Sequence, residues 1–111
     1  MKKIALIIAL AYATPAQAQY TSVCPAIGDM AETIMKIRQA EGSFQITWEH
    51  FDKMERDGDK FAWLYKKILI NAYDQPKFMT EAYKQHAVDE FRNAWVKSCY
   101  KVMSEPKGEK W

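Results

Sequence analysis

The sequence is poor in the residues on which most catalytic sites depend. It holds four glycines, two histidines and two cysteines in 111 residues. The glycines are too widely spaced for a phosphate-binding loop, and the sequence has no G-x-S-x-G nucleophile motif. Nucleotide-binding and serine-hydrolase chemistry therefore have no support, and we predict no catalytic residues and no enzyme activity.

Metal-binding patterns are also weak. His86 has Asp89 and Glu90 three and four residues later, a spacing that could form one side of a metal site on a helix. A solvated polar helix face explains the same pattern, and no second histidine lies nearby. The acidic stretch 52–59 lacks the alternating ligands of a calcium loop. We expect neither a metal nor a cofactor.

No apolar run approaches the roughly 20 residues of a membrane-spanning helix. The longest run, 4–13, follows Lys2 and Lys3 and precedes small residues at Ala16 and Ala18. This order is typical of a signal peptide cleaved after Ala18. We expect residues 1–18 to direct export and then to be removed, which leaves a product without a stable membrane anchor. Its location would be the periplasm, or outside a cell that has one membrane.

Cleavage would also remove the excess positive charge. Without Lys2 and Lys3, the 16 basic side chains become 14, which equals the 14 acidic ones. A neutral chain has no electrostatic reason to bind nucleic acid. The remaining length allows one domain, over 19–104, and the polar segment 105–111 is expected to be a loose tail.

The two cysteines, Cys24 and Cys99, lie near the two ends of the expected mature chain. In an oxidising compartment two cysteines allow one intramolecular disulfide. Two buried thiols are the alternative, which the export signal disfavours.

Apolar residues recur at steps of three and four in four segments, and no segment alternates with a period of two. The sequence therefore predicts an all-α fold with helices at about 25–41, 48–56, 60–74 and 80–103. We expect Thr47, Asp59 and Thr80 to cap helix starts, and we expect Gly42 and the Asp57–Gly58 turn to end helices.

A Cys24–Cys99 bond would bring the start of the first helix to the end of the last one. We therefore predict a small closed bundle of four helices. Its first and last helices are roughly antiparallel, and the two middle helices cover one side.

Aromatic side chains offer the one candidate for a binding surface. Trp63 is off the main apolar stripe of its helix, and Trp48 precedes the apolar face of a short helix. Partner surfaces favour Trp, Tyr and Arg, so we add Tyr73 and Arg38 to this candidate surface. The alternative is that these large side chains fill the core of a short domain.

Several short motifs show a resemblance to a known group of proteins. They are Cys24 before A-E-T-I-M at 31–35, Arg38-Gln39, A-Y-D-Q-P at 72–76, F-R-N at 91–93, and Cys99-Tyr100. The chain resembles short exported proteins encoded by tailed phages and prophages of Gram-negative bacteria. That group has no established activity, so the resemblance implies a setting in the host periplasm and no mechanism.

Together these observations predict an exported interaction module whose partner is an unknown periplasmic protein. Within the phage setting it would modulate host lysis or superinfection. The alternative is a small periplasmic stress chaperone or inhibitor, because such chaperones are also short, helical and closed by one disulfide. An enzyme that depends on His86 or Glu49 is a distant third.

Overall fold

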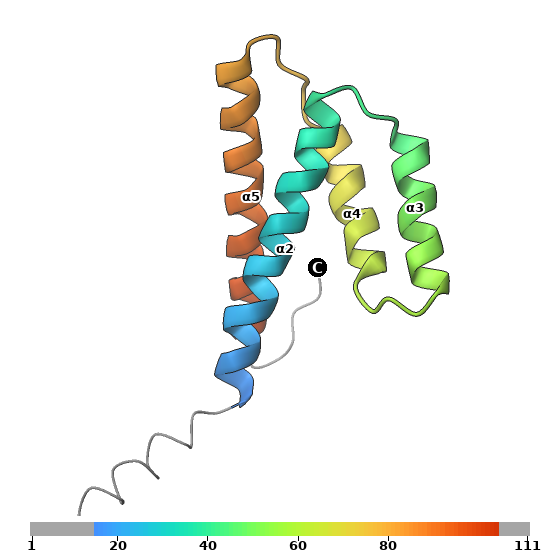
Figure 1. Cartoon of the computed structure of the whole chain (residues 1–111). Helices are drawn as coiled ribbons and strands as arrows, with labels where there is room; N and C mark the ends of the chain where they lie inside the picture. Colours follow the sequence, from blue (N-terminus) through green and yellow to red (C-terminus); the bar gives the residue numbers. More distant parts are fainter. Residues whose placement is uncertain (1–14, 105–111) are drawn as a thin grey trace, which may run out of the picture.

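The computed structural model describes residues 15–104, with side chains from residue 23 onward, and this part of the chain contains four α-helices and no strand (Figure 1). The helices are α2 (Pro15–Gln39), α3 (Phe44–Arg56), α4 (Ala62–Tyr73) and α5 (Glu81–Ser104). The predicted all-α class is confirmed. Residues 1–14 of the expected signal peptide and the whole tail, 105–111, lie outside the described residues.

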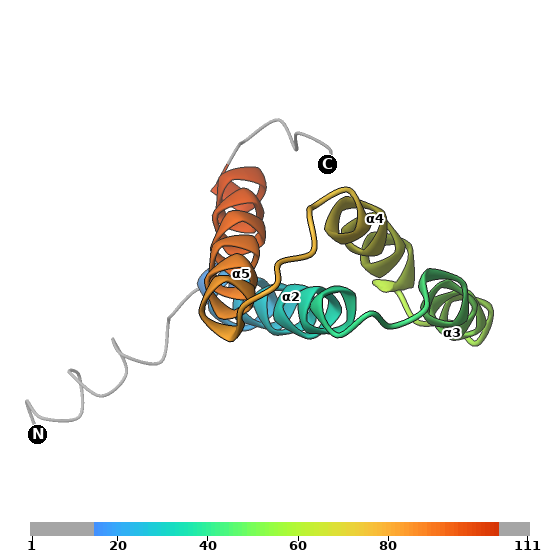
Figure 2. The ribbon, with the colours of Figure 1, turned by 90° about the horizontal axis from the view of Figure 1, so that it is seen from above.

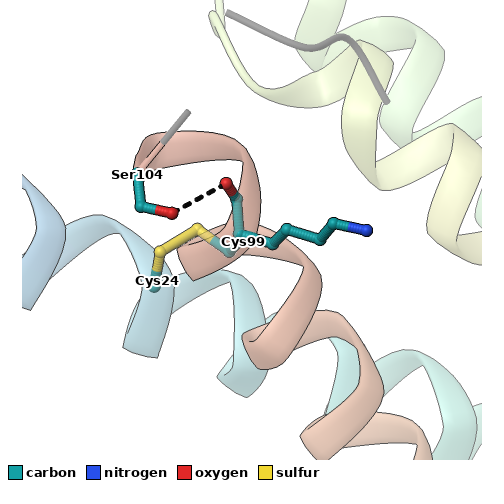
Figure 3. The surroundings of a disulfide bond; sticks show 4 residues. Cys24, Cys99 and Ser104 are labelled. Carbon is teal, nitrogen blue, oxygen red and sulfur yellow. Dashed lines mark hydrogen bonds between the residues drawn. A yellow bond between two sulfur atoms is a disulfide. The ribbon is translucent and has the colours of Figure 1, made fainter. Parts of the chain in front are cut away.

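The long helices α2 and α5 run in opposite directions and are inclined to each other, so that they lie closest toward the start of α2 and diverge toward its end (Figure 1). The disulfide between Cys24 and Cys99 joins the two helices with a Cα–Cα distance of 5.5 Å, and both cysteines are fully buried (Figure 3). The predicted pairing of the first and last helices is therefore confirmed. A disulfide is also consistent with an oxidising, exported location.

The shorter helices α3 and α4 form a hairpin beside this pair. Seen from above, α2 lies between α5 and α4, while α3 stands at the edge farthest from α5 (Figure 2). Helix α4 packs against both α2 and α3, whereas α3 packs mainly against α4. Of the two middle helices, α4 covers the long pair by packing on α2, whereas α3 lies outside α4, so the prediction that both middle helices cover the pair holds for α4 alone.

One apolar cluster fills the space between the helices. Its buried members come from all four helices, and they are Cys24, Ile27, Ala31, Ile34, Met35, Phe51, Leu64, Ile68, Leu69, Ala72, Val88, Phe91 and Cys99. Trp48, Tyr73 and Trp95 pack against the cluster from partly buried positions. On α5 the buried residues are Val88, Phe91 and Cys99, whereas the aromatic side chain of Tyr83 is 63% exposed.

The start of α2 differs from the prediction. The helix begins at Pro15 and continues through Pro25, so it crosses the expected cleavage position after Ala18. Alanine and glutamine between the two prolines are good helix formers, and Pro15 suits a first helical position. The sequence predicted a start at about residue 25, whereas Pro25 lies inside the helix.

The end of α2 is set by Glu41 and not by a glycine conformation at Gly42. Glu41 adopts a positive φ of 63°. The backbone N–H of Gly42 donates to the carbonyl of Ile37 at 2.8 Å, and that of Glu41 donates to Arg38 at 3.1 Å. These bonds form a Schellman motif with Glu41 in the left-handed position. Gly42 is needed for space, because a Cβ there would lie 2.4 Å from Cγ2 of Ile37.

Helix α3 begins four residues earlier than predicted. Its N-cap is Ser43, whose hydroxyl accepts a hydrogen bond from the N–H of Ile46 at 3.2 Å. The prediction that Thr47 caps this helix is wrong, since the Thr47 hydroxyl donates to the Ser43 carbonyl within the first turn. The first turn of α3 forms because Phe44 packs on aromatic rings from α3 and α4.

The remaining helix ends agree with the prediction to within two residues. Gly58 has a φ of 100°, which makes the Asp57–Gly58 turn. The Thr80 hydroxyl accepts from the N–H of Tyr83 at 3.2 Å, so Thr80 caps α5 as expected. The prediction that Asp59 caps α4 is wrong: the N-cap is Phe61, which makes no side-chain capping hydrogen bond, and Asp59 accepts from the N–H of Phe61 at 2.8 Å in the turn before the helix.

Within the described part of the chain, no helix combines the length and the apolar character that crossing a membrane requires.

Candidate functional site

Two of the four predicted surface residues, Arg38 and Tyr73, hold the connection between α4 and α5 against the end of α2. The guanidinium of Arg38 donates to the carbonyl of Gln75 from Nε at 3.2 Å and from Nη2 at 3.1 Å. The Tyr73 hydroxyl donates a short hydrogen bond to the carbonyl of Gly42. Burial of its ring raises the pKa of Tyr73. Both side chains therefore have structural roles.

The same two residues begin a continuous row of ring contacts. Cζ of Arg38 lies 5.1 Å from the centre of the Tyr73 ring. The Tyr73 ring meets Phe44 edge-on at 5.4 Å, and Phe44 stacks on Trp48 at 5.9 Å. Nζ of Lys66 lies 4.8 Å from the centre of the Trp48 ring. We call these five residues the aromatic ladder, and each contact lies in the range of aromatic or cation–π attraction.

An open hollow of about 370 Å³ lies on the outer face of this ladder. It is lined by Phe44, Gln45, Trp48 and Ile70. Phe44 is 38% exposed and Ile70 is 45% exposed, so the hollow presents apolar side chains to solvent. Because hydrogen bonds anchor the Tyr73 end and ion pairs anchor the Lys66 end, the rings are held in place without a bound partner.

The sequence did not identify Phe44 or Ile70. Phe44 was assigned to the connection before α3, although it stands four residues before Trp48 and seven before Phe51. That spacing is the signal that would have placed it on the same helix face. Ile70 lies off the apolar stripe of α4, and only the packing of α3 shows that it borders a hollow.

Trp63, the fourth predicted surface residue, does not join the ladder. It is 44% exposed at the start of α4, and Nζ of Lys67 lies 5.3 Å from its ring. The structure thus brings together Arg38, Trp48 and Tyr73 and leaves Trp63 apart from them.

Lys66 connects the ladder to two acidic residues of α3. Its Nζ lies 2.5 Å from Oδ1 of Asp52 and 2.9 Å from Oε1 of Glu55. The hydrogen bond from Lys66 lowers the pKa of Asp52, and the two carboxylates raise the pKa of Lys66. The Lys66 side chain is 13% exposed, so this is the least solvated ion pair among those described.

A second hollow, of about 410 Å³, separates α4 from α5. Met35, Pro76, Phe91 and other side chains line it, and it continues toward Trp95 as a smaller space of about 230 Å³. The indole N–H of Trp95 donates to Oδ1 of Asn71 at 3.1 Å and links the two helices there.

The predicted polar face around His86 lies on the surface. Nε2 of His86 lies 4.0 Å from Glu90, and both side chains are more than two-thirds exposed. Asp89 instead accepts a hydrogen bond from Gln85 at 2.9 Å. Over residues 15–104, no three histidine, cysteine or carboxylate side chains lie close enough together to bind a metal.

The short motifs that carry the family resemblance meet one another in space. Arg38 and Gln39 bind the corner at 73–76: Nε2 of Gln39 donates to the carbonyl of Pro76 at 3.0 Å. Across α2 and α5, Nε of Arg92 in the F-R-N motif lies 3.4 Å from Oε1 of Glu32 in the A-E-T-I-M motif. These motifs stabilise the fold, so they indicate an architecture more directly than an activity.

Comparison of the chain with protein-family models, with curated proteins and with solved structures found no match. The resemblance to phage-encoded exported proteins therefore stays a prediction.

Proposed function

We propose that this chain is an exported protein–protein interaction module of the periplasm, and that it binds its partner through the hollow beside the aromatic ladder. The observation that carries the proposal is the apolar hollow formed by Phe44, Trp48 and Ile70 on an already ordered surface. Large side chains that are half exposed and fixed in advance lose little conformational entropy on binding, which favours their use as anchors.

Two further features support this proposal. The disulfide between α2 and α5 is suited to an oxidising compartment, and the sequence before it has the pattern of a cleaved export signal. The resemblance to phage-encoded exported proteins supplies a setting, in which the partner belongs to the envelope machinery of lysis or superinfection.

The export step is tested by releasing the periplasm of a Gram-negative host that expresses the full chain. The expected product begins at Gln19 and contains the intact Cys24–Cys99 bond, which mass spectrometry before and after reduction would show. A full-length product retained in the cytoplasm would contradict the proposal.

The binding surface is tested by introducing a photo-crosslinking amino acid at Gln45, which lines the hollow, and at Lys53 as an exposed control on the same helix. We expect one discrete envelope partner to crosslink from position 45 and not from position 53. The variant Ile70→Glu should abolish this product. Ile46→Glu should not, because Ile46 is 70% exposed and lies outside the hollow.

Equal crosslinking from both positions, or crosslinking unaffected by Ile70→Glu, would contradict the proposed surface. If no discrete partner is captured, and the protein instead prevents aggregation of unfolded proteins, the chaperone alternative is favoured.

A further inference from the structure

Helix α3 is the least anchored of the four helices. It packs mainly against α4 at the outer edge of the bundle, and Phe51 is its one buried residue (Figure 2). Helix α4 buries five residues, and α2 and α5 are joined by the disulfide. Elements with few buried apolar contacts open at lower free energy than the rest of a domain.

The polar contacts between α3 and α4 converge on Lys66. Asp52 and Glu55 reach its ammonium group from α3, and Arg56 of α3 lies 3.9 Å from Asp52. On α4 itself, Lys67 is the neighbouring charge. From α2, which packs on another face of α4, Arg38 reaches the far end of the helix, at Gln75.

Acid changes the charge of the carboxylates in this cluster and leaves the charge of the lysine unchanged. Protonation of the two carboxylates removes both anions, whereas Lys66 keeps its charge. A cation whose side chain is only 13% exposed would then lie between the helices without a counterion. Separation of the helices returns that ammonium group to water, so acid favours the separated state.

We propose that α3 is an acid-released helix: below about pH 4, the ordinary titration range of carboxyl groups, it leaves α4 while α2, α4 and α5 stay folded. Release uncovers the apolar side of the hairpin, where the rings of Phe51 and Tyr65 lie 5.6 Å apart. This inference goes beyond the proposed partner binding, because it needs no partner and can fail independently.

The lowered pKa of Asp52 fixes the sign of the pH dependence. A carboxyl group with a lowered pKa in the packed state stabilises that state above its ordinary pKa. The stabilisation is lost as the pH falls through the lowered value. Attachment of α3 should therefore weaken toward acid and not toward base.

Hydrogen exchange on the disulfide-intact protein measures this release helix by helix, after correction for the intrinsic pH dependence of exchange. Between about pH 7 and about pH 2, an acid limit chosen to lie below the lowered pKa of Asp52, we expect the open fraction of α3 to rise about tenfold, the scale of two partly exposed ion pairs. The amides of α2 and α5 should stay protected. The fluorescent apolar probe bis-ANS should bind over the same pH range.

Three variants decide whether Lys66 is responsible. Lys66→Met removes the stranded cation but keeps an apolar stem, so α3 should stay protected at both pH values. The double variant Asp52→Asn/Glu55→Gln should open α3 at neutral pH. Glu81→Gln, which alters an exposed pair with Lys84 on α5, is the matched control and should leave the pH response unchanged.

The proposal is overturned if α3 is equally protected at both pH values, if all four helices lose protection together, or if Lys66→Met retains the acid response.

Discussion

Gly28 of α2 lies so close to Val96 of α5 that a Cβ atom at position 28 would be 2.4 Å from Cγ2 of Val96. The same atom would be 2.3 Å from Nη1 of Arg92. The two helices that the disulfide joins therefore approach each other closely at a position where one of them has no side chain. This contact explains a glycine inside a helix, where glycine ordinarily costs about 0.5–1 kcal/mol relative to alanine.

Gly28→Ala should destabilise the protein by about 1–3 kcal/mol, because overpacking outweighs the gain in helix propensity. Urea denaturation measures the change. Thr33→Ala, at an exposed position of the same helix, should change the free energy of unfolding by less than about 0.5 kcal/mol. A Gly28→Ala protein more stable than the wild type would show that the helices can move apart without cost.

Removal of the disulfide should lower stability without changing the helical class. The bond closes a loop with a sequence separation of 75, for which the chain-entropy model gives about 4–5 kcal/mol. Alanine is the appropriate replacement for Cys24 and Cys99, since serine would place hydroxyl groups at fully buried positions. We expect the double variant to keep its far-ultraviolet circular dichroism spectrum and to melt at a markedly lower temperature. An unchanged melting temperature would contradict this prediction.

Gln39 should be the most sensitive polar residue of the connection between α4 and α5. It is 3% exposed, its amide donates to the carbonyl of Pro76, and its Oε1 accepts from the N–H of Phe78 at 2.9 Å. Gln39→Leu leaves both backbone groups without this partner, and the expected loss is about 1–3 kcal/mol.

Gln85→Leu is the control for Gln39→Leu, because Gln85 makes one exposed hydrogen bond within α5. Thermal denaturation of both variants provides the comparison. If both variants lowered stability equally, water would be satisfying the backbone groups of Pro76 and Phe78 in place of the Gln39 amide, which would contradict the prediction.

Glu41 offers a pH-dependent test of the contact between the end of α2 and the connection. Its hydrogen bond with Lys77, together with the lysine charge, lowers the pKa of Glu41. The resulting stabilisation is present above the ordinary carboxyl pKa and is lost as the pH falls through the lowered value.

Carbon NMR titration should therefore give a Glu41 pKa below the ordinary value of about 4.3, and Lys77→Met should return it toward that value. Lys36→Met, which affects the separate pair with Glu32, should leave the Glu41 titration unchanged. The idea fails if Glu41 titrates identically in the wild type and in Lys77→Met.

The candidate site was only partly accessible from the sequence. Composition singled out Arg38, Trp48 and Tyr73, and these three side chains do meet in the ladder. Phe44, which joins Tyr73 to Trp48, was missed because the first turn of α3 was taken for a connection. Trp63 was included because it lies off the apolar stripe of α4. Such a position indicates that the side chain is exposed, but it does not indicate that other aromatic residues lie nearby.

The corrections to helix ends have a similar origin. Glycine is the usual residue for the left-handed position after a helix, so Gly42 was the reasonable choice. The structure places that conformation at Glu41, and Gly42 is needed for a different reason, since a side chain at position 42 would collide with Ile37. A crowding constraint of this kind depends on the three-dimensional path of the chain and leaves no mark in local propensity.

By itself, the sequence determined the all-α class, the apolar faces of the helices and the pairing of Cys24 with Cys99. Those features depend on local periodicity and on a single possible connectivity. Only the tertiary structure decided which helix covers which face. It placed α3 at the outer edge of the bundle, where its acidic side chains pair with Lys66 of α4. It also placed Phe44 between Tyr73 and Trp48 in the aromatic ladder. Periodicity marks the side of a helix that must be buried, but the partner that buries it is set by packing between residues far apart in the chain.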